Sequence, residues 1–121
     1  MKIFLAGILI IITASCYYDS QEFLYPKVNT TCDTTNVTYS KTVQPILSEN
    51  CYSCHSNSNA SLGGGYKLED YPDVKIRVDD GKLWGSITQA SGYFPMPPSG
   101  SLDGCSISKI KIWIDAKAPN N

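Results

Sequence analysis

Histidine and methionine are scarce in this chain of 121 residues, which has one histidine (His55) and two methionines (Met1 and Met96). Positive charge is not in excess either, because the chain has 10 Lys and Arg residues and 11 Asp and Glu residues, which gives a formal net charge of −1. A nucleic-acid-binding protein normally carries a basic surface, so nucleic acid is not expected as a partner. No carboxylate pair or second titratable cluster indicates catalysis, and we expect no enzyme activity.

Long hydrophobic runs are also missing. The apolar run at 3–12 is well short of the roughly 20 residues that span a bilayer. It follows the basic Lys2 and precedes the small residues at 13–15, a pattern typical of a secretory signal peptide, which we expect at 1–15. A true membrane helix is the alternative, and the length of the run disfavours it.

Cys16 directly follows these small residues, in the sequence Thr13-Ala14-Ser15-Cys16. This stretch resembles the lipobox of bacterial lipoproteins, in which the cysteine after the cleavage point is acylated and becomes the new N-terminus. The resemblance implies a lipidated leader at 16–37, with Cys16 as the lipidation site. It also implies an exported protein anchored on the periplasmic side of a bacterial membrane, either inner or outer.

Cys51-Tyr52-Ser53-Cys54-His55 has the C-x-x-C-H pattern of a c-type haem attachment site. Two thiols at this spacing reach the vinyl groups on one edge of a porphyrin and form thioethers. The histidine that follows then lies under the iron and supplies a ring nitrogen as proximal ligand. We therefore predict one covalent haem c, bound by Cys51 and Cys54 and ligated by His55.

Two other readings of the cysteine pair are a thiol–disulfide redox centre and half of a zinc site. A zinc site needs four ligands, and adjacent Cys54 and His55 point in different directions. A redox pair of the thioredoxin type is expected within a βαβ pattern, which is absent. Because the single histidine of the chain follows the C-x-x-C, haem attachment is favoured.

Two cysteines remain, Cys32 and Cys105. An exported protein reaches a compartment that permits disulfides, so we predict a bridge between them. Two free thiols are the alternative.

Apolar residues at helical spacing predict an all-α domain over 38–121. The expected helices are 41–50, 70–80, 82–89 and 105–116. Expected capping residues are Ser40 or Thr42 for the first helix, Asp70 for the second and Ser106 for the last. Trp84 is expected in the core. The Ser/Asn-rich stretch 56–61 and the three glycines at 63–65 predict a flexible turn, without the Lys-Ser/Thr that would indicate a phosphate loop.

Met96 lies in the stiff segment Pro95-Met96-Pro97-Pro98. Met1 is removed with the signal peptide, so Met96 is the one methionine left to ligate a haem iron. Flanking prolines lower the entropy that is lost when the sulfur is held in one place. We predict that Met96 is the distal ligand, with core packing or an open iron as the alternatives.

The order of these features resembles small class I c-type cytochromes from about Ser40 to Pro119. The segments 43–55, 96–97 and 110–119 are similar to the mono-haem, membrane-tethered lipoproteins of Bacteroidetes-type bacteria. The resemblance implies His/Met haem ligation, N- and C-terminal helices that cross beside the haem, long loops, and electron transfer between redox partner proteins, a respiratory donor and a terminal acceptor.

An iron with both axial positions filled suits outer-sphere electron transfer, so an electron carrier is the expected function. The alternatives are an electron-entry or sensor module of a larger periplasmic or membrane enzyme complex, and a haem-free redox or zinc domain.

Overall fold

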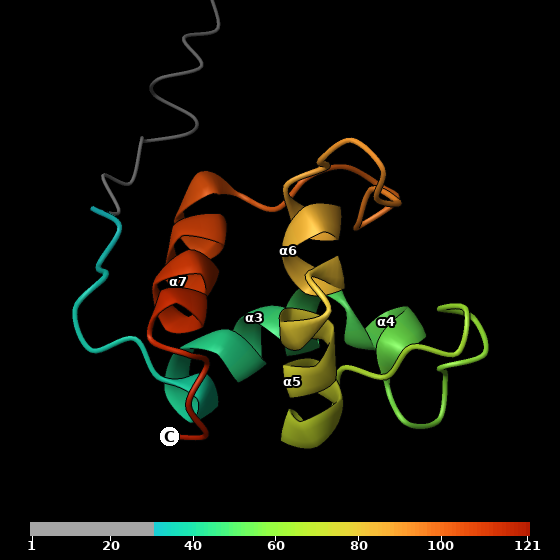
Figure 1. The fold of residues 1–121 in the computed structure, drawn as a ribbon, viewed down its shortest axis with the longest axis horizontal. Coiled ribbons are helices and arrows are strands. Elements are labelled where there is room, and N and C mark those ends of the chain that lie inside the picture. Colours follow the sequence, from blue (N-terminus) through green and yellow to red (C-terminus); the bar gives the residue numbers. More distant parts are fainter. Residues whose placement is uncertain (1–30) are drawn as a thin grey trace, which may run out of the picture. The chain divides into compact units, whose positions relative to one another are not determined.

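Helices are the regular secondary structure of residues 31–121, which are the part of the chain that the computed structural model describes, and no strand occurs among these residues. Figure 1 shows the helices and the long loops that join them. The all-α prediction is therefore confirmed for this part of the chain. The elements are η2 (Tyr39–Val43), α3 (Gln44–Asn50), α4 (Tyr52–His55), α5 (Tyr71–Asp79), α6 (Lys82–Ile87) and α7 (Gly104–Asp115).

The predicted signal peptide and the predicted lipidation site at Cys16 lie outside the described residues. From residue 31 onward, no helix is both long enough and apolar enough to cross a membrane.

The first predicted helix begins earlier than expected and has two parts. Thr38 caps the π-helical turn η2, because its side chain accepts a hydrogen bond from the Lys41 N–H at 3.2 Å. The expectation that Ser40 or Thr42 caps this helix is therefore wrong. Pro45 lies in the first turn of α3, where the missing N–H removes no helical hydrogen bond.

The other helices lie close to their predicted positions, but the cap of the last one differs. Asp103, not Ser106, caps α7, and its carboxylate accepts hydrogen bonds from the N–H groups of Cys105 and Ser106 at 2.9 and 3.0 Å. Asp70 is the N-cap residue of α5, as predicted, but its side chain makes no capping hydrogen bond, and its carboxylate instead accepts a hydrogen bond from the Asn57 amide at 2.9 Å.

The core is built from side chains of η2, α3, α5, α6 and α7, and the contact between η2 and α7 joins the two ends of the domain. The rings of Tyr39 and Trp113 lie 5.4 Å apart, and the backbone N–H of Ser40 donates to the Asn121 carbonyl at 2.8 Å. Trp84 packs partly buried against this core, as predicted. The largest fully buried side chains are Val43, Leu47, Val74, Ile110 and Trp113.

Cys32 and Cys105 form a disulfide, with their sulfur atoms 2.03 Å apart and their Cα atoms 5.5 Å apart. Cys32 lies before η2 and Cys105 lies in the first turn of α7. The bridge therefore fastens the segment that leads into the domain to the beginning of its last helix.

Candidate functional site

A cavity of about 630 Å³ lies between α3–α4, the α5–α6 pair and the loop that follows α6. Cys51, Cys54, His55 and Met96, the four residues predicted to bind a haem, all line it. Leu62 and Phe94, each 72% exposed, also line the cavity, so it reaches the protein surface. Further apolar side chains that line the cavity are Leu68, Leu83, Ile87, Pro97, Pro98 and Leu102.

The two cysteines and the histidine are presented by one tight turn. Cys51 ends α3, and its N–H donates to the Leu47 carbonyl at 2.8 Å. The Cys51 carbonyl then accepts hydrogen bonds from the N–H groups of Cys54 at 3.1 Å and His55 at 2.8 Å. A single helical turn therefore carries both sulfurs and the imidazole to the cavity wall.

Neither Cys51 nor Cys54 forms a disulfide. Burial raises the pKa of the Cys51 thiol to about 11, which leaves the thiol protonated at neutral pH. Thiol–disulfide exchange needs a thiolate and an environment that lowers the cysteine pKa. The surroundings of Cys51 therefore disfavour the redox-pair interpretation.

His55 is buried, with 8% of its surface exposed, and one of its ring nitrogens is already engaged. Nδ1 lies 2.9 Å from the Tyr66 carbonyl oxygen. Because a carbonyl only accepts, Nδ1 carries the proton and donates, and in the neutral tautomer that makes this hydrogen bond the lone pair lies on Nε2. A hydrogen bond of this kind to a backbone carbonyl sets the tautomer and orientation of a metal-ligating histidine.

Gly63 allows the His55 ring to lie against the backbone of the 56–65 loop. A Cβ atom at Gly63 would lie 2.3 Å from Nδ1 and 2.5 Å from Cε1 of His55, so no side chain fits there. The loop itself is held by hydrogen bonds from the N–H groups of Gly63 and Gly65 to the Ala60 carbonyl at 3.1 and 2.7 Å. The predicted turn is present, and Gly63 serves close packing in it.

Met96 is positioned by contacts between its loop and α6. Its N–H donates to the Ser86 carbonyl at 3.1 Å, and the Ala90 N–H donates to the Gly85 carbonyl at 2.9 Å. Gly85 is buried, and a Cβ atom there would lie 2.4 Å from the ring of Tyr93. The missing side chain at Gly85 therefore lets Tyr93 pack on α6 and holds the Met96 loop beside the cavity.

Gly63, Tyr66 and Gly85 belong to the site, although no sequence pattern assigned them to it. A glycine inside a predicted helix often indicates a close contact, so Gly85 had a usable signal. Tyr66 had no such signal in the sequence, because it contacts His55 through its backbone carbonyl, a group that every residue has.

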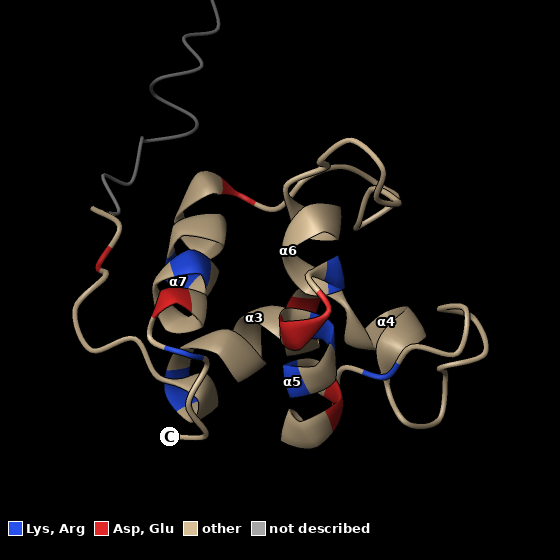
Figure 2. Ribbon diagram, viewed as in Figure 1, with Lys and Arg blue, Asp and Glu red and all other residues tan. Residues whose placement is uncertain are grey.

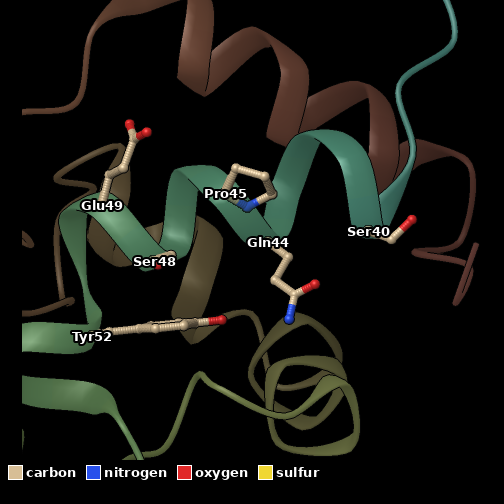
Figure 3. Close-up of a pocket in the computed structure, with 6 residues that line it drawn as sticks. All are labelled: Ser40, Gln44, Pro45, Ser48, Glu49 and Tyr52. Carbon is tan, nitrogen blue, oxygen red and sulfur yellow. The ribbon is translucent and has the colours of Figure 1, made fainter.

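A second, shallower groove lies outside this site. It has a volume of about 360 Å³, and Figure 3 shows the residues that line it, which come from η2, α3 and α4. Its walls are polar and apolar in similar measure, and none of the four predicted haem-binding residues lines it. The lining residues are Ser40, Gln44, Pro45, Ser48, Glu49 and Tyr52.

The zinc interpretation finds no matching ligand set in residues 31–121. No group of three or more His, Cys, Asp and Glu side chains in this region is arranged to hold a metal ion. A structural zinc site uses four such ligands.

The residues that line the large cavity fit a haem. Its volume is within the range of roughly 300–1,000 Å³ that is typical of small-molecule sites. Its wall offers two thiols, an imidazole nitrogen with a free lone pair and a thioether, and the rest of the lining is mostly apolar, as a porphyrin face requires. A haem supplies four ligands to its own iron, so two protein ligands complete the set.

Comparisons with protein-family models, with curated proteins and with solved structures find no match for this chain.

Proposed function

We propose that residues 38–121 form a class I cytochrome c-like domain that binds one haem covalently and transfers electrons. The observation that carries the proposal is the convergence of Cys51, Cys54, His55 and Met96 on one largely apolar cavity. The first three lie within a single turn, but Met96 comes from a distant loop, so their meeting is not a consequence of sequence spacing.

When bound, haem supplies an iron that cycles between the ferrous and ferric states. The residues of the protein would hold the haem and set its reduction potential. Cys51 and Cys54 would hold the ring through thioether bonds to two of its vinyl groups. His55 offers Nε2 as the proximal ligand, and its Nδ1–H bond to the Tyr66 carbonyl makes Nε2 a better donor.

Met96 offers its sulfur as the distal ligand. A thioether ligand raises the reduction potential of a haem, which suits donation to a terminal acceptor. If His55 and Met96 both ligate the iron, small molecules such as oxygen would find no open site on it, and electron transfer is the activity that this ligand set would support best.

Covalent attachment is tested on protein purified from its own host. Haem staining after denaturing electrophoresis should give a band at the mass of the polypeptide, and the Cys51→Ser/Cys54→Ser variant should give none. Ser53→Ala, which changes the residue between the two cysteines, is the matched control and should stain as the wild type does. Complete extraction of haem from the wild type by acid acetone would contradict the proposal.

Distal ligation is tested by Met96→Leu, which keeps the volume of the side chain and removes the sulfur. The ferric spectrum of the wild type should contain a sulfur-to-iron charge-transfer band that Met96→Leu lacks. The variant should also have a lower potential and bind carbon monoxide readily. Phe94→Ala, in the same loop, is the control and should keep the band. A wild type without the band that binds carbon monoxide freely would indicate a sensor or catalytic haem.

The second candidate is a haem c module that serves a larger periplasmic or membrane enzyme complex as its electron-entry domain. The exposed Leu62 and Phe94 at the cavity favour it, because a stable partner could cover them. Co-purification of a stoichiometric partner in mild detergent would support this candidate, whereas a monomer that reduces several acceptors would support the free carrier.

The membrane tether at Cys16 remains a separate proposal, based on the resemblance to lipoproteins. Cys16→Ser should move the protein from the membrane to the soluble fraction or leave the signal uncleaved. A wild-type protein that is already soluble and begins at another residue would contradict it.

A further inference from the structure

The charged residues that line the cavity are of one sign. Arg77 and Lys82 are the charged side chains among its lining residues, and no Asp or Glu contributes to the wall. Arg77 lies in the last turn of α5 and Lys82 begins α6, so both cations lie at the turn that joins these two helices. Figure 2 shows basic and acidic positions gathered at this turn.

Both cations pack against the same aromatic ring. The Arg77 guanidinium carbon and the Lys82 ammonium nitrogen each lie 5.1 Å from the centre of the Tyr66 ring. These distances are within the range of cation–π attraction. Lys82 also donates to the Tyr66 hydroxyl at 3.4 Å. Tyr66 therefore holds two like charges close together beside an apolar cavity.

One carboxylate lies between the two cations and does not line the cavity. An Asp80 carboxylate oxygen lies 2.7 Å from an Arg77 guanidinium nitrogen and 3.7 Å from the Lys82 ammonium. One acidic group thus balances two basic groups, which leaves a net positive charge at this edge. Arg77 is also the more enclosed of the two, with 22% of its side chain exposed against 49% for Lys82.

We infer that Arg77 and Lys82 form the binding edge for the propionate carboxylates of the haem, with Tyr66 as the residue that positions both cations. The inference rests on the proposed function. A largely apolar cavity with positive charge at one edge suits a flat apolar ligand that carries carboxylates at one end. The guanidinium can bind a carboxylate through two parallel hydrogen bonds, and the ammonium binds as a point charge.

Tyr66 links this edge to the proximal ligand. Its ring packs against the two cations, and its backbone carbonyl accepts the Nδ1–H bond of His55. One residue therefore sets the position of the carboxylate partners and the orientation of the axial imidazole.

The reduction potential of the holoprotein tests the inference. A cation beside a propionate offsets its negative charge and so favours the ferrous form. Arg77→Gln and Lys82→Gln should therefore each lower the potential, and Arg77→Lys should lower it less than Arg77→Gln. Asp80→Asn removes the competing carboxylate and should raise it. Lys75→Gln, also on α5 but outside the cavity, is the matched control and should leave the potential near that of the wild type.

A crystal structure of the holoprotein gives a second, direct measurement. Propionate oxygens should lie within about 3 Å of the Arg77 guanidinium nitrogens. Propionates directed away from Arg77 and Lys82, or a potential in Arg77→Gln and Lys82→Gln equal to that of Lys75→Gln, would overturn the inference while leaving the proposed function intact. A wild type without covalent haem on the denaturing gel would overturn both. If the Arg77→Gln variant does not accumulate, the inference is tested by the reduction potentials of Lys82→Gln and Asp80→Asn and by the positions of the propionates in the crystal structure.

Discussion

Tyr39 has an unusual hydroxyl group for a core residue. The side chain is 4% exposed, and its oxygen is buried without a hydrogen-bond partner within the described part of the chain. Tyr71, whose ring packs edge-on at 5.1 Å, donates its own hydroxyl hydrogen to the Ala118 carbonyl at 2.8 Å. Of these two neighbouring tyrosines, the partly buried Tyr71 has a paired hydroxyl group and the buried Tyr39 does not, among the residues that the structure describes.

Tyr39→Phe should leave the free energy of unfolding unchanged or raise it by about 1 kcal/mol, because it removes an unpaired polar group from the core. Tyr71→Phe should lower it by about 1 kcal/mol, because the Ala118 carbonyl then loses its partner. Urea denaturation at pH 7 measures both. A loss of stability in Tyr39→Phe as large as that in Tyr71→Phe would show that the Tyr39 hydroxyl has a partner.

The raised pKa of Tyr39 should also make the free energy of unfolding depend on pH in the alkaline range. Burial raises the pKa of Tyr39 to about 12 from an ordinary value of 10.0. The folded state therefore holds this proton more tightly than the unfolded state does, and stability should fall as the pH rises from about 10 to about 12. Tyr39→Phe should have a shallower decline than the wild type in urea denaturation between pH 9 and pH 12, and equal slopes would contradict this origin.

Gly63 and Gly104 are two glycines that should respond differently to replacement by alanine. Gly63→Ala should displace His55, since the new Cβ would lie 2.3 Å from Nδ1, and it should weaken the proximal ligation. Gly104→Ala meets open space in the first turn of α7 and should be neutral. The fraction of protein with the six-coordinate haem spectrum measures both variants. An unchanged spectrum in Gly63→Ala would contradict the packing argument.

At the scale of the helix, α7 depends on a cap that precedes it. Asp103 accepts hydrogen bonds from two backbone N–H groups and from the Ser106 hydroxyl, which donates at 2.6 Å. These bonds lower the pKa of the Asp103 carboxyl, with the Ser106 hydroxyl as the largest cause. The cap is therefore strongest where this carboxyl is ionised.

Asp103→Ala should lower the free energy of unfolding by about 1 kcal/mol at pH 7, because both N–H groups lose their acceptor. Ser106→Ala should lower it less, since the backbone bonds to Asp103 remain. The effect of Asp103→Ala should fade as the pH falls through the lowered pKa of Asp103 and the wild-type cap is protonated. Thermal unfolding at pH 7 and at pH 3 tests this, and a larger effect in Ser106→Ala would contradict the assignment of the cap.

For the whole domain, the disulfide is the covalent link between its two ends. Cys32 and Cys105 are separated by 73 positions, and the α7 core residue Trp113 packs on Tyr39 near the start of the domain. The bridge and the core therefore hold the same two segments together, one by covalent restriction of the unfolded chain and the other by burial.

Cys32→Ser/Cys105→Ser should lower the free energy of unfolding by about 4 kcal/mol in the chain-entropy account of a loop of this length. Reduction of the wild type should have a similar effect. Denaturant titration of the double variant and of the reduced wild type measures this loss of stability. Mass spectrometry of the unreduced wild type after alkylation should find no alkyl group on Cys32 or Cys105. Two alkylatable thiols at these positions would contradict the bridge.

Local features of the domain were predictable from the sequence. The helices follow from apolar spacing, because one face of each amphipathic helix must be buried wherever it packs. The meeting of Cys51, Cys54 and His55 follows from spacing as well, since one helical turn brings these positions together. The choice of Cys32 and Cys105 as a pair followed because these two cysteines remain once the others are assigned to the predicted haem attachment and lipidation sites.

Contacts between distant segments were decided only by the tertiary structure. Met96 lines the same cavity as His55 because Gly85 lets Tyr93 pack on α6. No periodic spacing of residues in the sequence indicates this contact. The Tyr66 carbonyl that orients His55 is a backbone atom, which every residue has. The gathering of Arg77 and Lys82 on one ring depends on the turn between two helices. Spacing describes one element at a time, whereas a binding site is built where several elements meet.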